Sequence, residues 1–134
     1  MTIEDEVGSA ADALVGAFAA HDPAGYFAAF DPSATFMFYT TDRLLGARSE
    51  WEAEWAALEA EGFHVDGCET AHRRIDVITD DVAILTHSVR TRIAGEAEVV
   101  RERETIVFRR NSDGRWLAVH EHLSPDPSAE LSGV

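Results

Sequence analysis

The sequence predicts an α+β domain in which early helices cover one face of an antiparallel sheet. Helical periodicity of the apolar residues is present up to Gly62 and disappears after it. Four strand-like segments then follow at 63–78, 82–94, 97–110 and 115–123, separated by turn residues. Sequential strands joined by tight turns pair antiparallel, and the helices before them must bury their apolar stripes against the sheet.

Capping signals mark where the first two helices begin. Thr2 with Asp5 three residues later is typical of a capping box, and the helix that it opens is expected to end near His21. Asp22 followed by Pro23 indicates an N-cap and a proline at the first helical position of a short second helix.

A strand and a third helix complete the N-terminal half. The aromatic strand is expected at 34–40, after Asp31-Pro32 has ended the second helix. A second capping box, Ser49 with Glu52, is expected to open the third helix, which Gly62 ends. The apolar stripe of this helix consists of Trp51, Trp55 and Leu58.

The last two strands form a hairpin with a possible site. The segment 111–114, Asn-Ser-Asp-Gly, supplies residues that tolerate the backbone of a hairpin turn. Alternation along the final strand predicts that His120 and His122 share a face with Trp116. The opposite face would carry Leu117, Val119, Glu121 and Leu123.

Composition sets limits on the class of protein. A chain of 134 residues fits one domain, expected at 1–124, with an irregular tail at 125–134. The net charge of −14, from 25 acidic and 11 basic residues, disfavours nucleic acid as a partner. Cys68 is the only cysteine, so an internal disulfide or a cysteine-based zinc motif is excluded. Without a targeting or membrane-spanning segment, we expect a cytoplasmic protein with no membrane partner.

The order of elements and the closing hairpin resemble the nuclear transport factor 2-like (cystatin-like cone) superfamily. Within it, the chain resembles the SnoaL-like and calcium/calmodulin kinase II association-domain branch. The resemblance rests on Glu104-Thr105, Arg109-Arg110, the segments 113–116 and 119–124, and more faintly on 20–36. It implies N-terminal helices packed in a strongly bent sheet, a pocket between them, and homodimers formed through the outer sheet face. The superfamily includes isomerases, cyclases, hydrolases, dehydratases and non-catalytic assembly domains, so the fold alone does not select a reaction.

Two branches of the superfamily can be compared residue by residue. Ketosteroid isomerases resemble this chain around 15–38, but Leu14 and Phe38 stand where their catalytic Tyr and general-base Asp would fall. Because neither side chain can exchange a proton, steroid isomerisation by the usual route is disfavoured. Of two pocket arginines in the kinase association domain, one falls at Arg90, whereas Ile106 replaces the other.

Histidines are the candidate catalytic residues. An imidazole can exchange a proton near neutral pH, so His120 and His122 could move a proton if their face points into the cone. They could equally be structural histidines satisfied by their neighbours. A metal role would need a further ligand from His72, His87 or Glu104, and no metal or other cofactor is predicted.

The candidate ligand-binding residues combine an aromatic wall with one charged pair. Arg90 would hold an anionic group of the ligand, or pair with Glu104 if it points inward. The aromatic residues could instead form a plain core stripe. The predicted ligand-binding set is Tyr26, Phe38, Trp51, Trp55, Arg90 and Glu104.

Three functional hypotheses follow. The first is a small-molecule-binding homodimer, possibly a cofactor-independent acid–base enzyme of the isomerase, cyclase or hydrolase type, acting on an apolar or carboxylate-bearing ligand. The second is a non-catalytic oligomerisation or ligand-sensing domain. The third is a stress protein whose pocket is filled by its own side chains.

Overall fold

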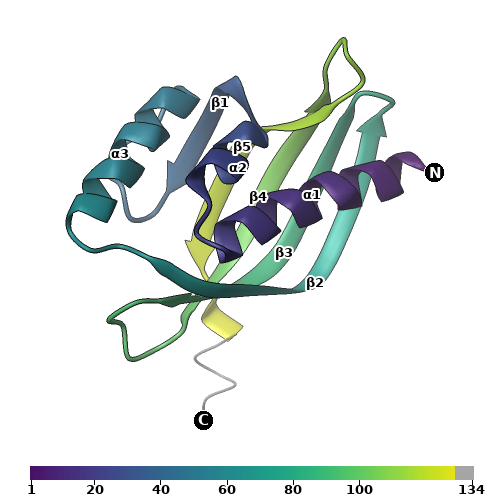
Figure 1. Ribbon diagram of the computed structural model, residues 1–134. Coiled ribbons are helices and arrows are strands. Elements are labelled where there is room, and N and C mark those ends of the chain that lie inside the picture. Colours follow the sequence, from purple (N-terminus) through teal and green to yellow (C-terminus); the bar gives the residue numbers. More distant parts are fainter. Residues whose placement is uncertain (129–134) are drawn as a thin grey trace.

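The computed structural model describes residues 1–128, which form three helices and five strands (Figure 1). The chain begins with α1 (Ile3–Ala19) and the short α2 (Pro23–Ala28), followed by the first strand and α3 (Arg48–Ala60). The strands are β1 (Phe30–Phe38), β2 (Val65–Thr79), β3 (Val82–Ile93), β4 (Val100–Arg110) and β5 (Trp116–Pro125). The predicted α+β class and element order are therefore confirmed.

All five strands belong to one curved sheet, in the order β1-β5-β4-β3-β2. The four sequential strands β2 to β5 pair antiparallel, as their tight turns predict. The first strand instead pairs parallel with β5, because the chain passes through α3 and the three hairpins before it returns to that edge. This parallel edge was not specified by the sequence pattern.

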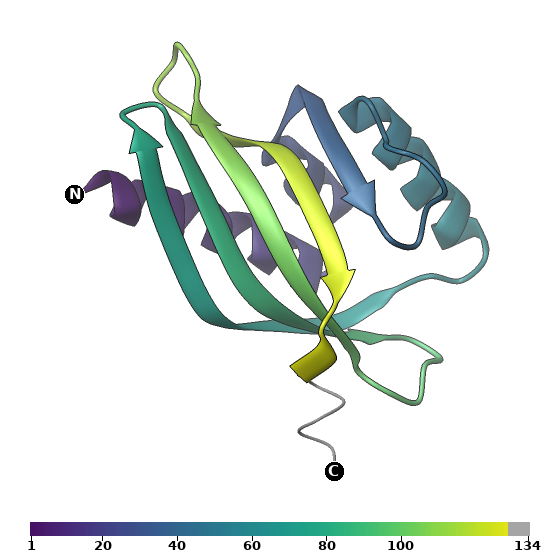
Figure 2. The same cartoon turned by 180° about the vertical axis from the view of Figure 1, so that it is seen from behind.

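The helices cover only one face of the sheet, which we call the inner face. α1 packs mainly on β2 and α3 on β1, so the bent sheet wraps around the helices (Figure 1). Figure 2 shows the opposite, outer face with no helix over it. The core lies between the helices and the inner face, where the largest fully buried side chains include Trp55, Phe30, Phe36 and Phe108.

The predicted helix caps are correct for the first two helices. Thr2 and Asp5 form both hydrogen bonds of a capping box, and Asp22 Oδ1 accepts from the Gly25 amide at 3.1 Å. The capping box expected at Ser49 and Glu52 is wrong, because α3 begins at Arg48, with Ala47 at the N-cap position, and has no side-chain cap. Glu52 is instead drawn to the Arg48 guanidinium, at 3.1 Å.

A β-bulge in β5 changes which side chains face the core. Phe108 pairs with Ala118 while its neighbour Val107 pairs with His120, so Val119 is an extra residue in the strand. An extra residue reverses the alternation beyond it. Trp116 and Ala118 therefore lie in the core, whereas the two histidines that follow the bulge are on the outer face.

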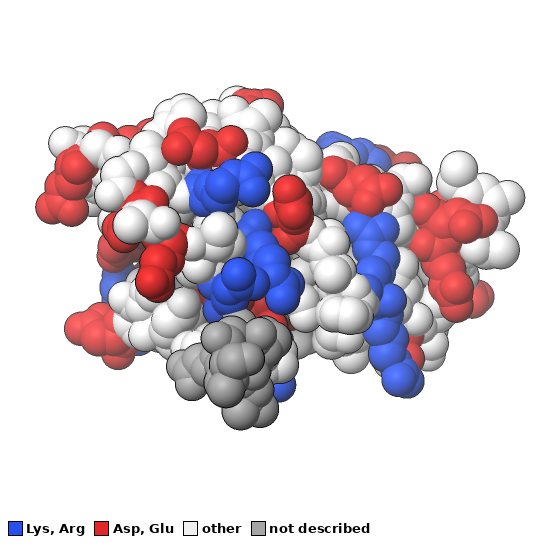
Figure 3. Space-filling view, turned by 90° about the horizontal axis from the view of Figure 1, so that it is seen from below, with Lys and Arg blue, Asp and Glu red and all other residues white. Residues whose placement is uncertain are grey.

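The charged side chains do not form a surface of one sign at the lower end of the molecule. Figure 3 views this end, close to the last described residues, and shows acidic and basic groups side by side. Since the chain contains no Lys, every basic group in this view is an arginine. This end of the molecule therefore carries charges of both signs.

Candidate functional site

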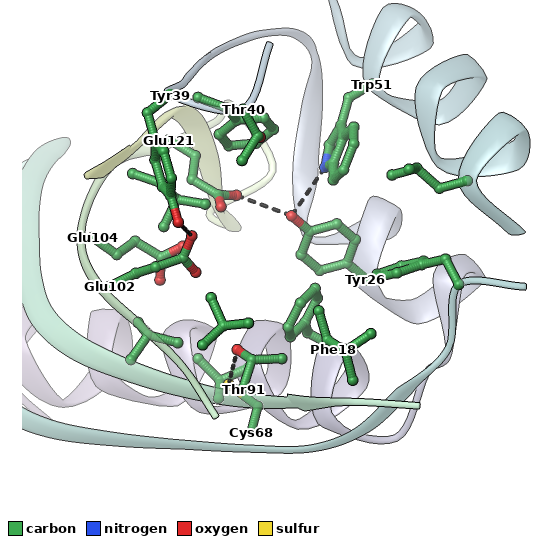
Figure 4. A pocket seen from close by; sticks show the side chains of 18 of the residues that line it. Phe18, Tyr26, Tyr39, Thr40, Trp51, Cys68, Thr91, Glu102, Glu104 and Glu121 are labelled. Atoms are coloured by element: carbon green, nitrogen blue, oxygen red, sulfur yellow. Dashed lines mark hydrogen bonds between the residues drawn. The ribbon is translucent and has the colours of Figure 1, made fainter. Parts of the chain in front are cut away.

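A cavity of about 520 Å³ lies between the helices and the inner face of the sheet. Its walls are mainly apolar and come from every layer of the fold: α1, α2, α3 and the inner faces of β2 to β5. The polar groups are concentrated at one side, where Figure 4 shows three carboxyl side chains opposite the Tyr26 ring. Those carboxyls belong to Glu102, Glu104 and Glu121.

A chain of hydrogen bonds begins at the Trp51 indole. Its Nε1–H group donates to the Tyr26 hydroxyl oxygen at 3.1 Å, and the hydroxyl donates to Glu121 Oε1 at 3.0 Å (Figure 4). An indole nitrogen can only donate, so the direction of the first bond is fixed. Tyr26 therefore directs its own proton at the Glu121 carboxyl.

Glu121 and Glu104 form a buried pair of carboxyls joined by a hydrogen bond. Burial, followed by the charge of Glu104, raises the pKa of Glu121 well above its ordinary value. Burial also raises the pKa of Glu104, to about 7, although the hydrogen bond from Glu121 lowers it in part. Two adjacent carboxyls in an apolar site cannot both ionise. Glu121 therefore holds its proton more tightly than Glu104, and Glu104 is the member that ionises first.

His87 contacts the pair from beneath the cavity floor. Its Nε2 atom lies 2.6 Å from Glu104 Oε1, and its side chain is fully buried. Burial lowers the His87 pKa to about 4, which makes the imidazole neutral. Nδ1 has no hydrogen-bond partner within residues 1–128. A buried lone pair costs less than a buried N–H without an acceptor, so we assign the proton to Nε2, where it is donated to Glu104.

The third carboxyl has a separate partner. The Tyr39 hydroxyl donates to Glu102 Oε2 at 2.7 Å (Figure 4). Partial burial and the Glu102 carboxyl raise the pKa of Tyr39 to about 12, and burial raises the pKa of Glu102. Tyr39 is 47% exposed, which places this pair where the cavity meets solvent.

The structure brings only part of the predicted site together. Tyr26, Phe38, Trp51 and Glu104 all line the cavity. Trp55 does not: it is 2% exposed and stacks on the Tyr26 ring within the core.

The predicted catalytic histidines do not reach the cavity. The bulge at Val119 puts His120 and His122 on the outer face, so the expectation of a face shared with Trp116 is wrong. His120 Nδ1 instead lies 2.7 Å from the Thr35 hydroxyl, and His122 is exposed.

Arg90 also lies outside the cavity. Its neighbours Val89 and Thr91 are buried and line the cavity, so strand alternation directs Arg90 to the outer face. It forms no pair with Glu104, which contacts His87. The interpretation of Arg90 as the anchor of an anionic ligand group is therefore wrong.

The sequence analysis missed the carboxyl neighbours of Glu104. One signal was available: Glu102 and Glu104 alternate with exposed residues on the face that also carries Ile106 and Phe108, which are apolar. Acidic residues at core-facing positions of a strand are unusual and indicate a site. Glu121 was hidden by the bulge, since regular alternation gives it to the same face as Val119.

The described part of the chain shows neither a metal site nor a membrane-spanning helix. Within residues 1–128, no three His, Cys, Asp or Glu side chains converge in a way that could hold a metal ion. None of the described helices is both long and apolar enough to cross a membrane.

The bent sheet and the helices inside it define a cone-shaped α+β protein that encloses an apolar cavity with buried carboxyls. The family model of the SnoaL-like domain matches residues 7–127. The chain therefore belongs to the SnoaL-like domain family, within the nuclear transport factor 2-like, cystatin-like fold. No curated protein sequence matches the chain significantly.

Solved structures similar to this one carry several different functional names. A candidate ketosteroid isomerase from Parabacteroides distasonis is 17% identical, covers 96% of this chain and 91% of its own, and has a TM-score of 0.76. A candidate calcium/calmodulin-dependent kinase II association domain from Xanthomonas campestris is 19% identical, with coverages of 95% and 90% and a TM-score of 0.76. A cystatin-like protein of unknown function from Nostoc punctiforme is 14% identical, with 96% coverage of both chains and a TM-score of 0.73. At these identities the likeness shows the fold alone.

Proposed function

We propose that this protein binds an apolar small molecule in the cavity and catalyses acid–base chemistry on it with the Glu104–Glu121 pair. The observation that carries the proposal is the pair itself: two hydrogen-bonded carboxyls, both at least nine-tenths buried, at the polar side of an apolar cavity. Ligand pockets are mostly apolar with a few convergent polar groups, and carboxyls with displaced pKa values are common in active sites.

The two carboxyls suit different halves of one proton-transfer reaction. Glu104 has a pKa of about 7, so a large fraction is ionised at neutral pH and can accept a proton from the substrate. Glu121 stays protonated and can donate a hydrogen bond, or its proton, to an oxygen that becomes negative. A carboxyl kept neutral by an apolar site is a known way to stabilise such an oxygen.

The other hydrogen-bonded residues favour a protonated Glu121 and an ionised Glu104. Tyr26 donates to Glu121 and in turn accepts from Trp51, so the Glu121 oxygen Oε1 is occupied and the proton lies on Oε2. The His87 N–H stabilises the ionised form of Glu104. Isomerisation, dehydration and cyclisation each need a proton acceptor and a proton donor beside one bound substrate, and an adjacent pair of carboxyls can supply both.

The experiment is a substrate screen in which one glutamate variant is compared with a matched control. Apolar carbonyl and hydroxyl compounds are incubated with the wild type, and proton exchange or product formation is followed by NMR. Glu104→Gln should abolish turnover while compounds still bind. Glu98→Gln removes the same charge from an exposed turn residue that does not line the cavity and should leave turnover unchanged. Full activity of Glu104→Gln would contradict the proposal.

A second role, assembly, is favoured by the bare outer face of the sheet (Figure 2). A row of residues crosses this face in register, with Ile84 opposite Val107 and Val107 opposite His120. We propose that two copies pair through this face to form a homodimer, which leaves both cavities free. Native mass spectrometry should show a dimer that Val107→Glu converts to a monomer. A wild type that is monomeric at micromolar concentration would contradict the dimer.

A further inference from the structure

All charged side chains that line the cavity are acidic. Within residues 1–128 the lining includes Glu54, Glu96, Glu102, Glu104 and Glu121 and contains no Arg or His. At the rim, the exposed Arg43 guanidinium lies 3.7 Å from Glu54 Oε1. A buried negative charge without a cation is unfavourable, so a positively charged ligand group would stabilise the ionised carboxyls of this cavity.

Among these carboxyls, Glu102 has an oxygen atom that is free to bind a ligand. The residue is 9% exposed, and only its Oε2 atom takes part in a hydrogen bond, the one from Tyr39. Oε1 has no partner among the described residues, and Figure 4 shows the side chain directed from β4 toward the interior of the cavity. His87 does not compensate the charge, because burial holds its imidazole neutral. The free oxygen of Glu102 is therefore available to accept a hydrogen bond from the ligand.

The apolar wall of the cavity is partly aromatic. Phe18, Phe38 and Phe63 line the cavity together with Trp51 and the two tyrosines. Aromatic faces attract cations, and they do so most strongly where water is excluded. Carboxyl oxygens beside aromatic faces are complementary to an ammonium group, while the remaining wall is complementary to an apolar body.

We infer that the ligand of this cavity is an organic cation, a protonated amine attached to an apolar or aromatic body. The inference rests on the proposed binding function of the same cavity and specifies its ligand class. The ammonium group would lie beside Glu102 and donate to Oε1, with the apolar body against the aromatic wall. A carboxylate-bearing ligand is disfavoured, because it would bring a further negative charge to an acidic cavity that contains no arginine.

The test uses three compounds of one shape and different charge: 2-naphthylmethylamine, 2-naphthylmethanol and 2-naphthoate. Their affinities for the intact protein are measured near pH 7 by calorimetry, with tryptophan fluorescence as an independent readout. The amine should bind about tenfold more tightly than the alcohol or better, and the carboxylate should bind most weakly. Amine binding should also release protons, seen as a dependence of the heat on buffer ionisation enthalpy, because a nearby cation favours ionised carboxyls.

A variant pair then locates the ammonium group. Glu102→Gln keeps the shape and the Tyr39 contact but removes the charge, so the preference for the amine should fall about tenfold while alcohol binding stays unchanged. Glu98→Gln, the exposed control, should keep the full preference.

The results distinguish a wrong ligand class from a wrong binding function. If the alcohol binds as tightly as the amine, or the carboxylate binds best, the organic-cation inference is wrong and the binding pocket stands. If none of the three compounds binds and native mass spectrometry and NMR screening of a varied apolar library find no ligand, the proposed function itself fails. The comparison on the wild type needs no variant to fold.

Discussion

His87 and Glu104 lie directly opposite each other on β3 and β4, with Nε2 and Oε1 2.6 Å apart under the cavity floor. Neither side chain is more than 9% exposed. The strand register therefore places a hydrogen-bond donor on the one pocket carboxyl that ionises near neutral pH. His87 does not line the cavity itself and acts through Glu104, as a positioning residue.

Removing the His87 donor should raise the pKa of Glu104. A hydrogen bond to a charged group contributes about 1.5–3 kcal/mol, which corresponds to roughly one to two pKa units. We expect His87→Leu to shift the Glu104 titration upward by about this amount, while His87→Gln, whose amide can still donate, shifts it less. Carbon-13 NMR of labelled glutamate measures both. Identical titrations in the two variants would show that the contact does not stabilise ionised Glu104.

The raised pKa of Glu104 predicts a pH-dependent loss of stability. The folded protein holds this proton up to a pKa of about 7, whereas the ordinary value is 4.5. Between these values the folded state binds more protons than the unfolded state, so stability falls as pH rises and levels off above 7. Relative to Glu104→Gln, the wild type should lose on the order of 3 kcal/mol across this window.

Urea unfolding of both proteins at a series of pH values from 4 to 8 checks this result. His87 contributes with the opposite sign, because its folded pKa of about 4 lies below the ordinary 6.5, and its contribution is lost as pH falls. Subtracting the free energy of unfolding of the variant from that of the wild type removes most of the His87 contribution. A difference, wild type minus variant, that stays constant or shrinks as pH falls would mean that Glu104 is ionised in the folded state well below pH 7.

His21 should contribute to stability outside the pocket. Its ring accepts from the Val65 amide at 2.9 Å and contacts Glu59 at 2.8 Å, so it ties the end of α1 to α3 and β2. Its backbone is left-handed, with φ of 50°. His21→Ala leaves the Val65 amide without its acceptor and should cost about 1–3 kcal/mol.

Equilibrium denaturation measures this loss, and His64→Ala is the matched control. The His64 ring stacks on His21 with centroids 4.2 Å apart but is exposed and bonds no buried amide. We expect its removal to cost less than 1 kcal/mol. Equal losses for the two variants would assign the effect to ring stacking instead of the bond to Val65.

Cys68 should report on whether the cavity is occupied. Its thiol lines the cavity, and burial raises its pKa to about 11. Since the thiolate is the reactive form, alkylation by iodoacetamide at pH 8 should be far slower than that of free cysteine and should slow further with bound ligand. Mass spectrometry follows the modification. A rate equal to that of free cysteine would place the thiol outside the cavity.

Local signals in the sequence predict most of the fold. The capping residues Thr2 and Asp22 fix where the first helices begin, and the turn residues near Gly114 fix the hairpins, because each acts on its own backbone. The start of α3 was wrong since Glu52 had another partner, Arg48, within one helical turn. Which of two such partners a side chain binds depends on its position in three dimensions, and the spacing of residues in the sequence does not reveal this.

The site was harder to predict than the fold. Tyr26, Phe38 and Trp51 were found because apolar and aromatic periodicity marks the inner surface. The inward-facing residues of β5 were predicted wrongly, because a single extra residue, Val119, reverses the alternation. The pairing with β4 decides where that residue is placed. A bulge is a property of two strands and leaves no mark on one of them alone.

Titration of the pocket carboxyls by carbon-13 NMR tests the central claim most directly. The account predicts that Glu104 titrates near 7 and that Glu121 remains protonated above that pH, with Glu104→Gln and Glu121→Gln used to assign the two signals. Titration of both carboxyls at the ordinary glutamate value, below 5, would contradict the buried acid–base pair and with it the proposed chemistry.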